Sequence, residues 1–223
     1  MKAMILAAGR GERMRPLTDT TPKPLLLVAG KPIIQYTIEQ LVRTGFTEIV
    51  INIAHLGQKI KDTLGTGAKF GASIAYSDEG HTALETAGGI SNAMHLLGKE
   101  TFLVVNGDIA NEYDFSQLYN KKIALAHLVL IPNPPHHPEG DFHLSNKGEV
   151  SEQGQRSLTY SGIGLYNPAL FNNLKPGISK LGPLLRQVMP DNKVTGEEFK
   201  GFWLDIGTPE RLNEMETYLR SCN

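Results

Sequence analysis

Short apolar runs alternate along the first half of the chain with longer segments whose apolar residues recur every three or four positions. The first pattern is typical of buried strands, and the second of helices that pack on a sheet. This alternation predicts parallel strands joined by crossover helices, and therefore an α/β fold. We expect strands at 3–7, 48–54, 73–77, 101–106 and 125–131, and helices at 32–43, 56–64, 86–97 and 209–220.

The second half of the chain is less regular. Residues 132–138 are rich in proline and must form a loop, because proline removes a backbone donor and restricts the residue before it. Shorter strand patterns follow at 142–144, 149–151 and 160–166. They predict an antiparallel extension that covers one end of the sheet. Since no internal repeat is present, we expect residues 1–223 to form a single domain without a C-terminal β-helix.

Composition narrows the class of protein. A chain of 223 residues can bury a sizeable core, and a net charge of −1 does not favour nucleic acid or a membrane surface as a partner. The single cysteine, Cys222, cannot form an internal disulfide. No apolar run reaches membrane-spanning length, and Met1-Lys2 leads directly into a strand rather than into a signal peptide. We therefore expect a cytoplasmic protein.

The first strand ends in small residues, Ala7-Ala8-Gly9, and is followed by a loop that carries three arginines and then Lys23. Small residues allow backbone N–H groups to close on a phosphate. The cations suit a polyanionic ligand such as a nucleoside triphosphate. A simple glycine turn with solvated arginines is the alternative.

Two better-known phosphate loops fit this segment poorly. A dinucleotide-binding loop needs a third glycine where Met14 stands, and an acidic residue after the second strand, where the chain has His55. The P-loop pattern of a glycine-rich turn ending in Gly-Lys-Ser/Thr is absent from the sequence.

Two aspartates are candidate metal ligands. Asp108 follows the apolar run 102–106, and ligands of open α/β sheets bind at the carboxyl ends of strands. A lone aspartate after a strand more often caps a turn or helix. Asp205 precedes Thr208-Pro209, which suit the start of the last helix but do not explain the aspartate. Two carboxylates at one sheet edge would suit Mg²⁺, which combines a few carboxylates with phosphate oxygens.

Segments 6–18, 22–24, 102–108 and 201–212 together resemble the sugar nucleotidyltransferases, the NDP-sugar pyrophosphorylase family. The motifs follow the family's order over nearly the whole chain. The resemblance implies a three-layer α/β/α Rossmann-like fold with a mostly parallel mixed sheet. It also implies Mg²⁺ as cofactor and an in-line attack of a sugar 1-phosphate on the α-phosphorus of a nucleoside triphosphate, which expels pyrophosphate.

The family's site residues map onto positions of this chain. The resemblance implies that Arg13 and Lys23 are catalytic and that Asp108 and Asp205 bind the metal. Segment 84–90 corresponds to part of the nucleobase pocket, although its residues alone also fit a helix start packed on the sheet. The implied nucleotide-binding residues are Leu6, Ala7, Ala8, Gly9, Gly11, Arg13, Lys23, Glu85, Gly88, Gly89 and Asn106.

Segment 131–142, with its Asn-Pro-x-His-x-Pro-x-Gly-Asp-Phe pattern, resembles family members that use UTP and N-acetylmuramic acid 1-phosphate in bacterial cell-wall recycling. This implies Asp141, Tyr160 and Gly162 as sugar-binding residues.

Other substrate pairs stay open, because Ala87 stands where the family has a third glycine. Mannose 1-phosphate with GTP, or glucose 1-phosphate with a thymidine nucleotide, are alternatives, as is a non-catalytic sugar-nucleotide-binding subunit. Location and charge make His136, His137 and Arg156 candidates for binding the lactyl carboxylate of muramic acid. The two histidines lack partners at zinc-ligand spacing, so we expect a surface loop near the sugar site.

Overall fold

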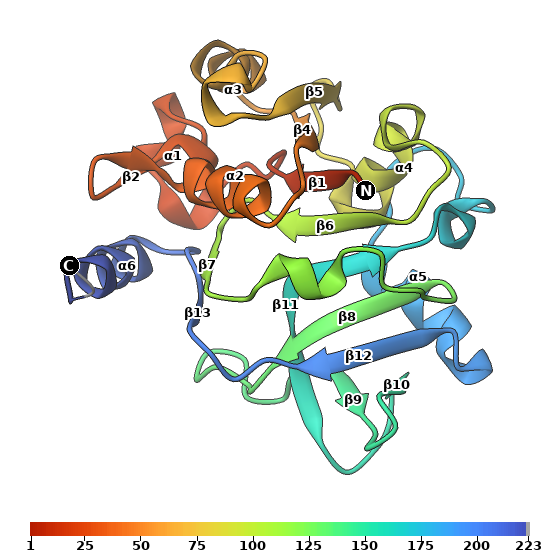
Figure 1. Cartoon of the computed structure of the whole chain (residues 1–223). Helices are drawn as coiled ribbons and strands as arrows, with labels where there is room; N and C mark the ends of the chain where they lie inside the picture. The colour runs from red at the N-terminus through yellow and green to blue at the C-terminus, as the bar shows by residue number, and fades with distance from the viewer. Residues whose placement is uncertain (222–223) are drawn as a thin grey trace.

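The computed structural model describes residues 1–221, so Cys222 lies outside the described residues. Its centre is a mixed nine-stranded sheet with the order β10-β9-β11-β6-β1-β4-β5, and β8 and β12 continue from β11 (Figure 1). The four strands of the N-terminal half are mutually parallel, as the sequence predicts. They are β1 (Ala3–Leu6), β4 (Glu48–Ile53), β5 (Ser73–Asp78) and β6 (Phe102–Asn106).

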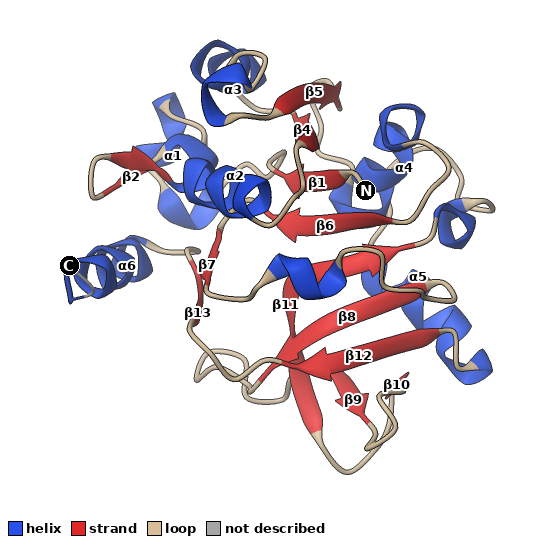
Figure 2. Ribbon diagram, viewed as in Figure 1, coloured by secondary structure: helices blue, strands red, loops and turns tan. Residues whose placement is uncertain are grey.

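The antiparallel part is larger than the sequence indicates. The strand β11 (Ser157–Tyr166) enters the sheet beside β6, and β8 (Ala126–Ile131) pairs with its other side. The predicted extension therefore joins the middle of the sheet instead of only covering one end. The strands β9 (Phe142–Leu144) and β10 (Val150–Ser151) continue from the start of β11, at the end of the molecule opposite α3 in Figure 2.

Helices cover both faces of the parallel strands. In β1, Ala3 and Ile5 face one hydrophobic cluster, whereas Met4 between them faces another, as the two-residue period of a strand requires. Residues of α2 and α3 complete the first cluster, and residues of α4 and α5 the second, which gives the expected three layers. The helices are α1 (Leu17–Thr20), α2 (Ile33–Arg43), α3 (Gly57–Leu64), α4 (Glu85–Leu97), α5 (Leu181–Val188) and α6 (Pro209–Ser221).

Two small ribbons and one edge strand have no counterpart among the predicted elements. The strand β12 (Val194–Glu198) runs parallel to β8. The ribbon of β7 (Ile109–Asn111) and β13 (Trp203–Asp205) is antiparallel, as is that of β2 (Leu27–Val28) and β3 (Lys31–Pro32). A third hydrophobic cluster packs α6 and the β7–β13 ribbon against Met14 of the glycine-rich loop.

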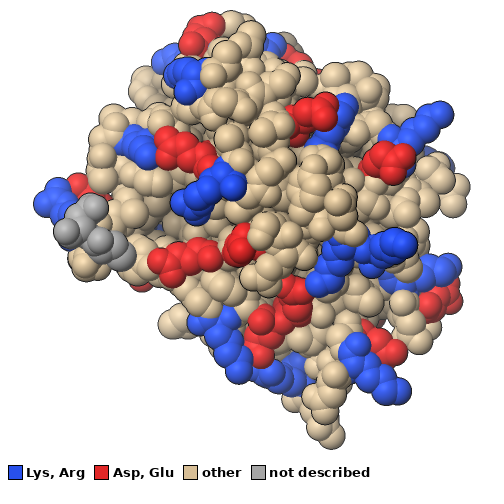
Figure 3. Space-filling model, viewed as in Figure 1, with Lys and Arg blue, Asp and Glu red and all other residues tan. Residues whose placement is uncertain are grey.

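The exterior shows no concentration of one charge on the face drawn in Figure 3, where basic and acidic side chains are interspersed. This agrees with the net charge of −1. Within residues 1–221, none of the helices has the length and apolar character needed to cross a bilayer.

Candidate active site

A cavity of about 370 Å³ lies at the carboxyl ends of the parallel strands. Its walls come from the segments that follow β1, β5 and β6 and from the first turn of α4. Seven of the eleven predicted nucleotide-binding residues line it, namely Leu6, Ala7, Ala8, Gly9, Lys23, Glu85 and Asn106. The other four, Gly11, Arg13, Gly88 and Gly89, are not part of its lining.

A chain of hydrogen bonds that the sequence analysis missed organises the cavity wall. The Ala7 amide donates to Asn52 Oδ1 at 2.7 Å, and Asn52 Nδ2 donates to Glu79 Oε1 at 2.7 Å. The other Glu79 oxygen accepts from the Leu84 amide just before α4. The ends of β1, β4 and β5 are thus tied to the start of α4. A polar residue inside the apolar run 49–53 is the one signal that could have revealed Asn52.

Gly88 and Gly89 are buried inside α4. A Cβ at Gly88 would collide with the Gly177 carbonyl, and one at Gly89 would lie 2.5 Å from Glu79 Oε1. Close packing therefore accounts for both glycines. This is the interpretation that the sequence analysis gave as the alternative to a nucleobase pocket, a helix start packed on the sheet. Contact of either glycine with a nucleobase stays a prediction.

Lys23 and Asp108, predicted for separate roles, form an ion pair. Lys23 Nζ lies 2.5 Å from Asp108 Oδ2, and both residues line the cavity. The lysine side chain is only 10% exposed, so its charge would be costly to bury without this partner.

The β7–β13 ribbon brings the two predicted metal ligands together. Asp205 lies opposite Ile109 in the antiparallel register, and the Ile206 amide donates to the Asp108 carbonyl at 2.7 Å. Two aspartates from distant parts of the sequence therefore lie on neighbouring backbone segments, and their joint binding of a metal stays a prediction.

Arg13 is close to Asp205 as well. A Cβ placed on Gly207 would lie 2.8 Å from Arg13 Nη2 and 3.0 Å from Asp205 Oδ2. The Arg13 side chain is exposed and has no hydrogen-bonding partner within the described part of the chain. Its guanidinium is therefore open to an anionic ligand.

Asp205 has two further neighbours: Arg211, which the sequence analysis did not single out, and His136, whose contact with Asp205 it did not predict. Arg211, in the first turn of α6, forms an ion pair with the Asp205 carboxylate. His136 Nε2 lies 3.1 Å from Asp205 Oδ1 and 3.0 Å from Arg211 Nη1. The proline-rich loop thus reaches β13, the strand that carries Asp205. Only the tertiary structure reveals the contacts of His136 with Asp205 and Arg211, because His136 is far from both residues in sequence.

The other candidates for the lactyl carboxylate have local partners. His137 Nε2 lies 3.1 Å from Asp141 Oδ1, and Arg156 pairs with Glu198. Among residues 1–221, no three His, Cys, Asp or Glu side chains are grouped as a metal cluster.

The predicted sugar-binding residues lie at the bulge of β11. Asp141 Oδ2 accepts from the Tyr160 amide at 2.8 Å, and the Tyr160 hydroxyl is 2.9 Å from that of Tyr166. Burial raises the pKa of Tyr160 well above its usual value. Gly162 has a φ of +82°, and a Cβ there would lie 2.5 Å from Asn106 Nδ2. Each residue thus has a local structural role, and contact with a sugar stays a prediction.

A doubly covered α/β sheet with a glycine-rich loop and a lysine–aspartate ion pair in the cavity wall is the arrangement expected of a nucleotide-binding α/β protein. The family model described as "Nucleotidyl transferase" matches residues 2–221, and the chain belongs to this family.

Comparison with individual proteins narrows the relationship. The chain is 53% identical over 224 residues to the N-acetylmuramate alpha-1-phosphate uridylyltransferase of Neisseria meningitidis serogroup B, covering 97% of both chains. It is 31% identical to the protein of the same name from Caulobacter vibrioides, covering 93% of this chain and 92% of the relative. A solved structure described as a glucose-1-phosphate thymidylyltransferase from Bacillus anthracis superposes with a TM-score of 0.87 at 27% identity, covering 100% of this chain and 96% of the other.

Proposed function

We propose that the protein transfers UMP from UTP to N-acetylmuramic acid 1-phosphate, giving UDP-N-acetylmuramic acid and pyrophosphate in bacterial cell-wall recycling. The observation that carries nucleotidyl transfer is the ion pair of Lys23 with Asp108 in the cavity wall, with Asp205 on the strand that pairs with the segment after Asp108. The 53% identity to the Neisseria relative over nearly its full length supports this substrate pair. Because UTP is made inside cells, we place the enzyme in the cytoplasm.

The reaction needs positioning and charge neutralisation more than a protein nucleophile. A phosphate oxygen of the sugar 1-phosphate attacks the α-phosphorus of UTP and forms a new P–O bond. The bond from the α-phosphorus to the bridging oxygen breaks, and its electron pair leaves with pyrophosphate. Lys23 would neutralise the α-phosphate and the incoming phosphate. Arg13 would stabilise the pyrophosphate, whose negative charge grows as it leaves.

Asp108 and Asp205 would hold Mg²⁺. The donor set fits this ion, because Mg²⁺ is bound through one or two carboxylates together with phosphate oxygens and water. Each carboxylate also has a cationic partner, Lys23 or Arg211, which compensates its charge in the protein alone. When bound, Mg²⁺ would screen the two anionic reactants from each other.

The nucleotide would occupy the cavity lined by residues 6–9, and the sugar would lie beyond Asn106. We assign the sugar side to the bulge of β11, because Gly162 packs directly on Asn106. Gly162 would then offer its backbone to the sugar, and Asp141 and Tyr160 would shape the same side of the site.

The proposal is tested by pyrophosphate release in the presence of Mg²⁺, with UTP, GTP, CTP, ATP or dTTP against a panel of sugar 1-phosphates. We expect strong activity only with UTP and N-acetylmuramic acid 1-phosphate, and its loss when EDTA is added. Preference for another pair would keep the chemistry and overturn the specificity. No release with any pair would favour a non-catalytic sugar-nucleotide-binding protein.

A further inference from the structure

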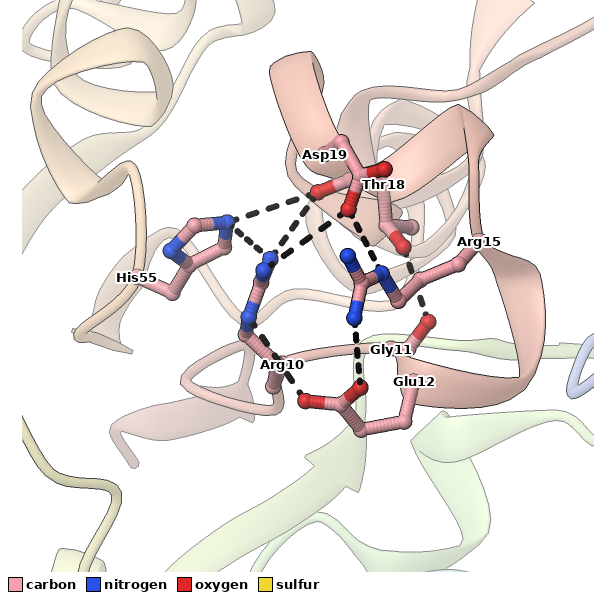
Figure 4. Close-up of polar contacts among 7 residues, drawn as sticks. All are labelled: Arg10, Gly11, Glu12, Arg15, Thr18, Asp19 and His55. Carbon is pink, nitrogen blue, oxygen red and sulfur yellow. Dashed lines mark hydrogen bonds and ion pairs between the residues drawn. The ribbon is translucent and has the colours of Figure 1, made fainter.

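Arg10 lines the cavity and is tied to the segment that follows β4 (Figure 4). Its Nη1 donates to the Thr18 carbonyl at 3.1 Å and also contacts His55 Nε2. A guanidinium can only donate, so His55 Nε2 must be the acceptor of that hydrogen bond. His55 Nε2 also lies 3.4 Å from the Thr18 carbonyl, so the imidazole, the Arg10 guanidinium and this carbonyl form one polar cluster.

The charge of Arg10 is only loosely compensated by its neighbours. The carboxylates of Glu12 and Asp19 lie 3.6 and 3.8 Å from its nitrogens, beyond hydrogen-bond distance. Asp19 instead accepts a 2.7 Å hydrogen bond from Arg15 Nε, as Figure 4 shows. The hydrogen bonds of Arg10 thus go to a backbone carbonyl and an imidazole nitrogen rather than to a carboxylate, and its side chain is 36% exposed.

The other cation of the cavity wall is already paired. Lys23 is held by Asp108, and the wall also carries the carboxylates of Glu79 and Glu85. A triphosphate brought into this cavity needs more positive charge than Lys23 supplies. Arg10 is the cation of the lining, within the described residues, that has no carboxylate at hydrogen-bond distance.

We propose that Arg10 binds the terminal phosphates of the nucleoside triphosphate, and that His55 is a positioning residue that holds its guanidinium toward the cavity. The planar guanidinium matches phosphate oxygens in a two-point contact. This inference rests on the proposed function and adds to it a residue that distinguishes a triphosphate from a monophosphate. Sequence reasoning alone did not separate Arg10 from the other arginines of the loop.

Isothermal titration calorimetry with UTP and with UMP, both in the presence of Mg²⁺, tests the assignment. Because Arg10→Ala loses a charge-assisted contact, this variant should bind UTP about 10- to 100-fold more weakly than the wild type. Its affinity for UMP should stay within about twofold of the wild-type value. His55→Ala should also bind UTP more weakly than the wild type. His55→Gln should restore much of it, because the glutamine amide oxygen can accept the Arg10 hydrogen bond.

Arg15→Ala is the matched control. Arg15 lies in the same loop, pairs with Asp19 and Glu12, and is not part of the cavity lining, so its removal should leave both affinities unchanged. An equal loss of UTP and UMP binding in Arg10→Ala, or no loss of either, would overturn the role of Arg10. A failure of His55→Gln to recover binding would overturn the role of His55. If the wild-type protein bound a different triphosphate, the specificity proposed above would fail, and the same comparison with that nucleotide and its monophosphate would still decide the role of Arg10.

Discussion

Lys23 Nζ lies 2.5 Å from Asp108 Oδ2, which joins the segment after the glycine-rich loop to the end of β6. A buried lysine needs such a partner, and the carboxylate needs a counter-charge when no metal is bound. The two groups are therefore held at the cavity wall before any ligand arrives. In the proposed reaction the same pair would supply a cation for phosphate and a carboxylate for Mg²⁺ at one small site.

Lys23→Met should reduce kcat about 100-fold or more with a smaller change in KM, because the variant loses a charge that acts chiefly on the transition state. Methionine keeps most of the apolar stem of the buried side chain. Steady-state kinetics check the prediction, with Lys31→Met as the control. Lys31 pairs with Glu39 outside the cavity lining, so its loss should leave turnover unchanged. Equal turnover in Lys23→Met and wild type would contradict the catalytic assignment.

Arg211→Gln should bind Mn²⁺, a paramagnetic substitute for Mg²⁺, about 3- to 10-fold more tightly than the wild type, because Asp205 loses a competing cation worth about 1 kcal/mol. Electron paramagnetic resonance of free Mn²⁺ measures this without turnover. Asp205→Asn should instead weaken binding. If Arg211→Gln weakened Mn²⁺ binding as well, Arg211 would support the metal site rather than compete with the ion.

The Glu197 carboxylate should stabilise the fold at pH values above the ordinary pKa of a glutamate, and not in acid. Hydrogen bonding from His127, together with Lys121 and Tyr113, outweighs burial and lowers the pKa of Glu197 from 4.5 to about 2. Its contribution is therefore complete above about pH 5 and is lost as the pH falls toward 2.

Glu197→Gln should lower the free energy of unfolding by about 1–2 kcal/mol at pH 7, a value reduced for partial exposure, and by less at pH 3. Urea unfolding at both pH values measures the difference. Glu48→Gln, at an exposed position at the start of β4, should change little at either pH. A loss that was the same at pH 7 and pH 3 would show that the charge of Glu197 is not responsible.

Gly162→Ala should impair both stability and turnover. Its φ of +82° disfavours a side chain by about 1–2 kcal/mol, and the new methyl group would push against Asn106 in the cavity wall. Gly30→Ala is a matched control, because Gly30 has a φ of +77° and open space around it. Both variants should lose stability in thermal unfolding, whereas only Gly162→Ala should lose turnover. Full activity in Gly162→Ala would separate this bulge from the site.

The parallel half of the fold could be predicted to within a residue or two, because its strands are apolar runs that end in small or polar residues. The helix α5 was missed since Gly182 and Pro183 stand in its first turn, and β12 since its sequence, Val-Thr-Gly-Glu-Glu, is mostly polar. The local pattern of β11 predicts a strand but not its place between β6 and β8 in the middle of the sheet. The sequence therefore predicts too small an antiparallel part.

Segments 102–108 and 201–212 predicted both aspartates, and the structure brings them together. The contacts of Arg211 and His136 with Asp205 could not be predicted, because they depend on how the proline-rich loop and α6 pack on the β7–β13 ribbon. The same limit applies to Asn52 and Glu79. Local sequence identifies residues able to do chemistry, and tertiary packing decides which of them meet.

A competition assay tests the central claim most directly. The wild-type enzyme would receive equal concentrations of UTP, GTP, CTP, ATP and dTTP together with N-acetylmuramic acid, N-acetylglucosamine, glucose and mannose 1-phosphates, and mass spectrometry would identify the first products. We predict UDP-N-acetylmuramic acid as the dominant product, absent from a parallel reaction of Asp108→Asn. Dominance of any other nucleotide sugar, or undiminished product from Asp108→Asn, would contradict the account.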